Sequence, residues 1–249
     1  MIPLKFGKEL EFMREAGRIS ALALKAAGEA IKPGVTTKQI DEAARRCIES
    51  YGAKPSFLGE GGFPAAACIS VNDEVIHCVP GERVIEYGDI VSVDVGAYIH
   101  GFHGDNARTF ACGEISDEAQ RLLEVTEKSL HDAIKVAKIG SRIGDIGFTV
   151  QNFVEKNGFS VVRKFVGHGI GRSVHEEPSV PNFGVPGSGG LLVKGMVIAI
   201  EPMVNVGKEK VRILDDGWSV VTADGSLSAH FEHTVAITED GPLILTIPY

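Results

Sequence analysis

Four carboxylate side chains stand where buried strands are expected, and this conflict limits how the chain can fold. Asp94 interrupts a run of β-branched residues, and Glu201 ends another apolar run. Asp105 follows a glycine-rich turn, and Glu232 precedes a further apolar strand. An ionised carboxylate that loses its hydration costs several kcal/mol unless a partner compensates it. The fold must therefore bring these side chains to a source of positive charge.

His168 adds one nitrogen to this acidic set. Glycines on both sides of it favour a tight turn that presents the ring as a ligand. A phosphate-binding loop is excluded, because no Gly-x-Gly-x-x-Gly stands at a strand–helix junction and no P-loop lysine is present. Oxygen-rich ligation with one imidazole suits two divalent ions such as Mn, Fe, Co or Zn, which can activate water for hydrolysis. The sequence thus predicts a dinuclear metal site formed by Asp94, Asp105, His168, Glu201 and Glu232.

Taken alone, each residue also has a simpler structural interpretation. Asp94 could pair with an arginine or cap a loop, and Asp105 could be a turn residue. His77 follows two apolar residues, where a histidine is more often structural. His175 comes seven residues after His168 and could be a second ligand or a proton shuttle. The remaining histidines are interpreted as structural: His100, His103, His131, His230 and His233. Of these, His131 lies in the middle of an expected helix, and we expect it to face solvent.

Size and composition favour one globular catalytic domain over residues 1–249. The chain is 44% hydrophobic and 23% charged, and its net charge of −8 makes DNA an unexpected partner. No apolar run approaches the ~20 residues of a membrane span, and the charged start has no apolar signal-peptide core. The four cysteines form no CxxC motif. We expect a cytoplasmic protein with reduced thiols and no membrane contact.

Helical periodicity predicts two helices in each half of the chain, followed by antiparallel strands. Thr36 and Gln39 have the spacing of a capping box, Ser116 is a plausible N-cap, and Pro33 with Gly34 ends the first helix. The expected helices are 8–31, 38–51, 117–137 and 143–157. The expected strands are 68–71, 90–95, 103–110, 160–165, 196–200, 210–214, 218–222 and 231–238.

A faint internal repeat relates the two halves. Gly88 precedes Asp94 by six residues, as Gly195 precedes Glu201, and each glycine starts a β-rich run that ends at a carboxylate. We therefore expect pseudo-repeats of about 1–115 and 116–249 within the single domain, with the metal site at their interface.

Five strings, in this order, resemble those of the type I methionine aminopeptidases, a group in metallopeptidase family M24. They are CISVNDEVIH (68–77), GFHGD (101–105), GHGIGRSVHEEP (167–178), EP (201–202) and FEHT (231–234). The resemblance runs from about residue 8 to 245, is specific as a set, and is greatest with the short bacterial form.

The resemblance implies an α/β (α+β) pita-bread fold, with two pseudo-symmetric halves, an antiparallel sheet and outer helices. It implies that Asp94 and Asp105 bridge or chelate two divalent metals (Co, Mn, Fe or Zn), that His168 binds one of them, and that Glu232 bridges them. Glu201 would be both a ligand and the general base for a metal-bridged hydroxide. The implied reaction removes N-terminal methionine from nascent proteins and peptides when the second residue is small.

The resemblance also implies a substrate site. His77 and His175 would contact the substrate backbone and stabilise the tetrahedral intermediate. The side-chain pocket would have Cys68, Phe63 and Trp218 as walls. This sequence departs from the family in that pocket, since aromatic residues are expected where it has Glu60 and Val174. The departures concern side-chain selectivity rather than reaction type.

Further expectations follow from the same resemblance. Asn72, Glu74 and Ser228 match a structural monovalent-cation site of some members. The expected partners are the N-termini of nascent polypeptides, with the ribosome as a candidate, and a monomer is the simpler oligomeric state. The alternatives are an X-Pro aminopeptidase or dipeptidase, and a non-catalytic pita-bread protein that binds peptides. Because bulky Ile2 follows Met1, the chain is predicted to keep its own Met1.

Overall fold

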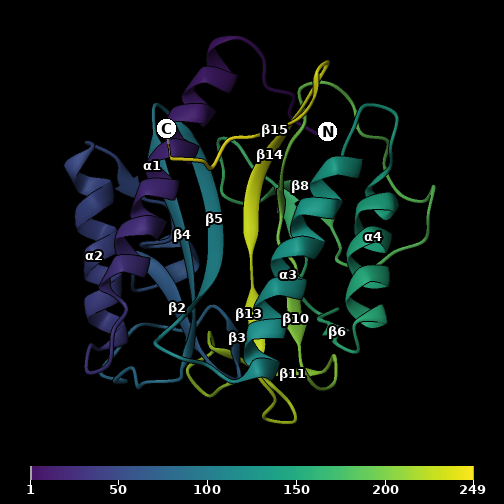
Figure 1. Ribbon diagram of the computed structural model, residues 1–249. Helices are drawn as coiled ribbons and strands as arrows, with labels where there is room; N and C mark the ends of the chain where they lie inside the picture. Colours follow the sequence, from purple (N-terminus) through teal and green to yellow (C-terminus); the bar gives the residue numbers. More distant parts are fainter. Residues whose placement is uncertain (1, 249) are drawn as a thin grey trace.

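The computed structural model describes residues 2–248 and has a pair of helices at the start of each half, as predicted (Figure 1). The purple and blue pair lies beside the strands of the first half, and the teal and green pair beside those of the second. The helices are α1 (Lys8–Ala30), α2 (Thr37–Ser50), α3 (Asp117–Val136) and α4 (Ile143–Lys156), with a short 3-10 turn η1 (Glu60–Gly62).

Local capping explains why the helix starts could be read from the sequence. The Thr36 side chain accepts a hydrogen bond from the Gln39 amide, and the Gln39 side-chain oxygen accepts one from the Thr36 amide, which confirms the capping box. Ser116 caps α3 in the same manner through the Ala119 amide. Each helix end lies within two residues of its expected position.

Antiparallel pairing joins most of the strands, within the described residues, into one nine-stranded sheet with the order β1-β4-β5-β14-β9-β7-β8, to which β2 and β15 add. Its strands are β1 (Lys54–Pro55), β2 (Ala67–Val71), β4 (Ile90–Ile99), β5 (Phe102–Ala111), β7 (Gly167–Gly169), β8 (Glu176–Val180), β9 (Val197–Ile200), β14 (Glu232–Thr238) and β15 (Gly241–Ile244). Two smaller sheets contain β6 (Ser160–Val161), β10 (Met203–Asn205) and β13 (Ser228–His230), and β3 (Glu74–Ile76), β11 (Val211–Ile213) and β12 (Val220–Thr222).

Several strand predictions were wrong in extent. The strand expected at 160–165 pairs only over β6, and the strand expected to end near Val95 continues to Ile99. His168 does not lie on a tight turn. Gly167 and Gly169 both pair with neighbouring strands, which makes this segment strand β7. Its glycines are required for strand packing, because a Cβ on Gly167 would meet the carbonyl oxygen of Ala199 at 2.4 Å.

Side-chain alternation along β4 places Asp94 on the face of the sheet away from the helices. Val91, Val93 and Val95 belong to the hydrophobic cluster that includes residues of α1 and α2. Asp94 lies between two of them, so it points to the opposite face. On the neighbouring strand β5, Asn106 accepts a hydrogen bond from Ser20 of α1.

The same rule orients the other three carboxylates. Asn106 faces the helices, so Asp105 on the same strand faces away from them. In the second half Ile200 and Phe231 belong to the cluster packed with α3 and α4. Glu201 and Glu232, each one residue further along the chain, therefore lie on the face that carries Asp94 and Asp105.

Equivalent glycines open β4 and β9. Gly88 and Gly195 both have positive φ angles, of 97° and 89°. Their amides donate to the carbonyl oxygens of Cys112 and Ile237, at the far ends of the strands paired with β4 and β9. Strands β5 and β14, which pair with each other, stand side by side between the two helix pairs in Figure 1. The division near residue 115 stays a prediction.

None of the helices within residues 2–248 is both long and apolar enough to span a bilayer. The four cysteines are free thiols, and three of them are buried.

Candidate active site

A pocket of about 340 Å³ opens on the face of the sheet away from the helices and has walls from both halves of the chain. Every residue predicted to bind metal or substrate lines it, as do Phe57, Glu60, Ile76, Lys164, Phe165 and Val166. The predicted residues come from widely separated segments: Phe63, Cys68, His77, Asp94, Asp105, His168, His175, Glu201, Trp218 and Glu232. The fold thus brings the whole candidate set into one cavity.

The carboxylates at the floor of the pocket have buried oxygens without hydrogen-bond partners. Among the described residues, Oδ1 of Asp94, Oδ1 of Asp105 and Oε1 of Glu232 accept no hydrogen bond. Asp105 and Glu232 are 3% and 2% exposed, so water does not compensate them freely. An unpaired buried polar group costs about 1–3 kcal/mol, and more if it is charged. Oxygens left open in this way fit direct ligation of divalent cations.

Three ligand atoms come close enough to share an ion. One atom each from Asp105, His168 and Glu232 lie within 4.8 Å of one another. Glu201 approaches the same group, because its Oε1 lies 3.4 Å from Nε2 of His168. Thr234 holds β5 against β14 at this point by exchanging two hydrogen bonds with the Asp105 backbone.

The local structure of β7 fixes the orientation of His168. Its Nδ1 lies 2.9 Å from the carbonyl oxygen of Gly169 and donates to it, which leaves Nε2 with a free lone pair facing Glu201. A backbone hydrogen bond of this kind is the usual way in which a metal-binding imidazole is held. Burial lowers the pKa of His168 to about 4, with a smaller contribution from His175. The ring is therefore neutral at pH 7, as a ligand must be.

Burial raises the pKa of all four carboxylic acids. For Asp105 it does so to about 7. For Asp94, burial acts together with the charges of Asp105 and Glu201, and the charge of Asp105 also opposes ionisation of Glu201 and Glu232. Such a cluster takes up protons unless cations occupy it, so its electrostatics and its unpartnered oxygens both fit bound divalent metal.

His77 and His175 stand at the side of this cluster. The His175 and His168 rings have centroids 4.4 Å apart, and the His77 ring packs edge-on against Phe165 at 5.7 Å. Burial lowers the pKa of His77 to about 4, and it also lowers that of His175, against the opposing charge of Glu60. Both imidazoles are neutral at pH 7 and can donate one hydrogen bond each.

The other end of the pocket is apolar and well packed. Phe63 meets Trp218 edge to face, with ring centroids 5.3 Å apart. Cys68 and Val174 belong to the same small hydrophobic cluster. Glu60 lies at the rim of this wall in η1, a turn that needs left-handed backbone at Gly59, Gly61 and Gly62. The pocket therefore has an apolar wall as well as a carboxylate-rich floor.

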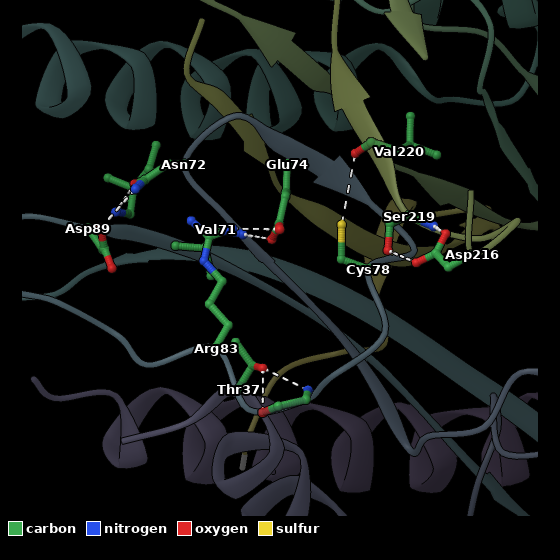
Figure 2. Close-up of polar contacts among 12 residues, drawn as sticks. Thr37, Val71, Asn72, Glu74, Cys78, Arg83, Asp89, Asp216, Ser219 and Val220 are labelled. Atoms are coloured by element: carbon green, nitrogen blue, oxygen red, sulfur yellow. Dashed lines mark hydrogen bonds and ion pairs between the residues drawn. The ribbon is translucent and has the colours of Figure 1, made fainter. Parts of the chain in front are cut away.

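The residues of the predicted monovalent-cation site already have partners, and Figure 2 shows those of Asn72 and Glu74. Asn72 bonds to Asp89, and Glu74 accepts from the Val71 amide and pairs with Arg83. Ser228 bonds to Asn205, and its amide donates to the carbonyl oxygen of Asn72. No buried unpartnered oxygen marks these three residues among those described, so the cation site stays a prediction.

Sequence reasoning did not assign His230 to the site. The structure places its Nε2 3.7 Å from Oε2 of Glu201. A signal was present in the sequence, because His230 precedes Glu232 by two residues and extended backbone turns such a pair to one face. Other histidines keep the interpretation given above: His103 and His233 bond to Ser56 and Thr246, and His131 is exposed on α3.

Comparison with known proteins shows the family of the chain. The model of metallopeptidase family M24 matches residues 11–239. The methionine aminopeptidase of Clostridium perfringens is 55% identical over 247 residues, and methionine aminopeptidase 1 of Bacillus subtilis is 52% identical over 246 residues; each alignment covers 99% of both chains.

Solved structures show the same relationship. Methionine aminopeptidase from Thermotoga maritima has a TM-score of 0.97 and 46% identity, with 99% of each chain covered. The prolidase from Pyrococcus horikoshii OT3 has a TM-score of 0.81 and 25% identity, and the match covers 99% of this chain and 64% of that one. The fold is therefore the pita-bread fold of these enzymes, and the chain belongs to metallopeptidase family M24, within its methionine aminopeptidase group.

Proposed function

We propose that this chain is a metal-dependent aminopeptidase that removes N-terminal methionine from peptides and nascent proteins. The observation that carries the proposal is the cluster of buried carboxylates with unpartnered oxygens, which opens into a pocket with an apolar end. Two divalent ions (Co, Mn, Fe or Zn) would be held by Asp94, Asp105, His168, Glu201 and Glu232. Divalent ions lower the pKa of water, which makes it a nucleophile at neutral pH.

Glu201 would be the general base. It is 9% exposed and lies at the floor of the pocket with one oxygen near His168. Asn182 donates a hydrogen bond of 2.9 Å to the Glu201 backbone carbonyl. This bond holds the backbone from which the Glu201 side chain extends. A carboxylate held in this position can accept a proton from the attacking water and deliver it to the leaving amine.

His77 and His175 would bind the scissile peptide. Both line the pocket beside the carboxylates and are neutral at pH 7. A neutral imidazole N–H aimed at the carbonyl oxygen stabilises the negative charge that develops there. His175 lines the pocket and is exposed, so a bound peptide could reach it.

The apolar end would select the side chain. Phe63, Cys68 and Trp218 offer a flat and polarisable wall to the thioether of methionine. Val174, where an aromatic residue was expected, is 1% exposed and packs in the same cluster without lining the pocket. Glu60 lies at the rim, where it can attract a cationic group beyond the scissile bond without entering the apolar wall.

An X-Pro aminopeptidase or dipeptidase is the second candidate, since the fold is shared with prolidases. The prolidase similarity is 25% identity, against 55% for a methionine aminopeptidase over the whole chain. A non-catalytic peptide-binding protein is less favoured still, because every predicted ligand is present in the pocket.

Hydrolysis of two tripeptides tests the choice. Protein stripped with a chelator is incubated with Met-Ala-Ser and with Ala-Pro-Ser, with and without added Mn²⁺ or Co²⁺. We expect metal-dependent release of methionine from the first peptide only. Cleavage of Ala-Pro-Ser would favour the second candidate, and cleavage of neither peptide by metal-loaded protein would contradict the proposed activity.

Three related statements are also proposals. The protein would act in the cytoplasm as a monomer on emerging N-termini, with the ribosome as a candidate partner. A structural monovalent cation would lie near Asn72, Glu74 and Ser228. The chain would keep its own Met1, a residue outside those that the structure describes, because Ile2 is bulky. Loss of Met1 in the intact mass of native protein would contradict the expected preference for a small second residue.

A further inference from the structure

His230 is a buried side chain whose two ring nitrogens make no hydrogen bonds to the described residues. It is 1% exposed, at the end of β13. Neither Nδ1 nor Nε2 has a hydrogen-bond partner among the described residues. Buried ring nitrogens almost always have partners, so an imidazole in this state calls for an explanation.

The backbone holds this imidazole rigidly beside the pocket. Thr109 of β5 accepts a hydrogen bond of 2.9 Å from the His230 amide and donates one of 3.0 Å to its carbonyl oxygen. Ser92 of β4 lies 2.8 Å from the same Thr109 hydroxyl. His230 also pairs in register with Met203 of β10. Strands of both halves therefore fix the position of the ring.

Glu201 is the polar group that the ring approaches. Nε2 of His230 lies 3.7 Å from Oε2 of Glu201, slightly more than hydrogen-bond length. The other oxygen, Oε1, lies 3.4 Å from Nε2 of His168. The Glu201 carboxylate thus stands between two imidazoles, one of which is a predicted metal ligand. A neutral imidazole carries a single N–H, which can donate to one carboxylate oxygen.

We propose that His230 is a positioning residue that donates its Nε2 hydrogen to Oε2 of Glu201 and so orients that carboxylate toward the metal site. The inference rests on the proposed function, since it concerns a proposed ligand and general base. A displacement of a few tenths of an ångström in either side chain closes the gap to a hydrogen bond. His230 does not line the pocket, so it would act through Glu201 and not on the substrate.

A purely space-filling role does not account for this arrangement. A leucine of similar volume would fill the same position without leaving two buried nitrogens unpaired. Groups that hydrogen-bond to metal ligands restrict the ligands' orientation, and their loss typically weakens metal affinity or activity by about 10- to 100-fold. His230 is placed to make one such bond.

Two substitutions of His230 and one matched control test the proposal. His230→Leu removes the donor and keeps the volume, whereas His230→Gln keeps an N–H donor of similar reach. His233→Leu removes a partly buried imidazole on the helix side of the sheet, where Nδ1 bonds to Thr246, and serves as the control. The affinity for Mn²⁺ is measured by calorimetry on chelator-stripped protein, and kcat and KM for Met-Ala-Ser are measured at saturating Mn²⁺.

We expect His230→Leu to bind Mn²⁺ roughly 10- to 100-fold more weakly and to lose kcat by a similar factor, with KM changed by less than about threefold. His230→Gln should restore most of both, and His233→Leu should leave both within about twofold of wild type. Wild-type Mn²⁺ affinity and kcat in a folded His230→Leu variant would overturn the inference. So would a folded His230→Gln variant as weak as His230→Leu.

A second measurement does not depend on a variant that folds. Nitrogen-15 NMR of histidine-labelled, Zn²⁺-loaded wild-type protein reports which ring nitrogen of His230 carries the hydrogen. The proposal requires the Nε2–H form, and an Nδ1–H form would overturn it. Failure of wild-type protein to bind Mn²⁺ at all would instead reject the proposed function, so the two failures are distinguishable.

Discussion

The two ends of the pocket are built in opposite ways. At the floor, buried oxygens of Asp94, Asp105 and Glu232 lack partners among the described residues. At the apolar end, Phe63, Trp218 and their neighbours pack closely, with rings in edge-to-face contact. The first region is costly to fold without a ligand, and the second contributes to stability by itself.

This difference assigns separate tasks to the two regions. The unpaired buried carboxylates lower the stability of the metal-free protein. Active sites commonly combine lower stability with the groups that the reaction needs. Substitutions at the floor should therefore reduce turnover while the metal-free protein keeps or gains stability. Substitutions at the apolar end should reduce stability and change which side chain is accepted.

The largest expected effect is at the floor. Glu201→Gln keeps the shape of the side chain but removes the general base, so kcat for Met-Ala-Ser should fall by about 10²–10⁴-fold. The metal-free variant should melt at the same temperature as wild type or higher, because the amide stays neutral where burial opposes ionisation of the carboxyl group. Steady-state kinetics and calorimetry measure both. Glu49→Gln, at an exposed ion pair on α2, is a control that should change neither. Retained kcat would remove Glu201 from its assigned role.

The apolar end should respond with lost selectivity. Trp218→Ala removes one wall of the side-chain pocket, and a methionine side chain that loses part of its burial loses about 2 kcal/mol of binding. We expect kcat/KM for Met-Ala-Ser to fall by roughly 10- to 50-fold, with little change in metal affinity. An equal fall for Met-Ala-Ser and for a norvaline analogue with a shorter side chain would contradict this placement.

The melting temperature should depend on pH in opposite directions for the metal-free and the metal-loaded protein. The pKa of Asp105 is raised by burial to about 7, above its usual value of 3.8. Because the folded-state pKa lies above the unfolded one, Asp105 contributes to the free energy of unfolding in a pH-dependent way. This contribution is complete below pH 3.8 and is lost as the pH rises through about 7. Metal-free protein should therefore melt at least ~5 °C lower at pH 8 than at pH 5.

Bound metal should reverse that trend, because protons and cations compete for the same oxygens. The melting temperature of the Mn²⁺-loaded protein should rise between pH 5 and pH 8. Scanning calorimetry at several pH values, with and without chelator, measures the two curves. Parallel curves would mean that the carboxylates do not hold the metal.

The smallest effect should be at the rim. Glu60 is exposed and interacts with substrate charges through water, where such pairs are worth about 0.2–1 kcal/mol. Wild type should prefer Met-Ala-Lys over Met-Ala-Glu by roughly 2- to 5-fold in kcat/KM, and Glu60→Gln should abolish the preference. The same preference in the variant would assign it to another residue, and Lys164 on the pocket wall would be tested next.

Elements specified by local interactions could be predicted from the sequence. The starts of α2 and α3 follow from Thr36 and Ser116, whose side chains cap the helices. The start of β4 follows from its β-branched residues, which alternate with Ser92 and Asp94. The four carboxylates could be recognised because each stands within or next to an expected strand. The alternation of side chains along extended backbone explains why all four lie on one face of the sheet.

Elements that depend on pairing with other strands could not be predicted from the sequence. The three-residue strand β7 exists because Gly167 and Gly169 pair with β8 and β9, and in the sequence those glycines indicate a turn. The proximity of His230 to Glu201 depends on the pairing of β13 with β10 and on Thr109 of β5. The contact of Thr109 with His230 joins residues 121 positions apart, and no local pattern encodes any of these pairings.

The central claim is that the unpartnered carboxylates form a divalent metal site that makes the pocket hydrolytic. The most direct test titrates chelator-stripped protein with Mn²⁺ while counting bound ions and the methionine released from Met-Ala-Ser in the same sample. The account predicts no release without metal, saturation at two ions per wild-type chain, and loss of both metal binding and release in Asp105→Asn. Full release by metal-free protein, or undiminished metal binding by Asp105→Asn, would contradict it.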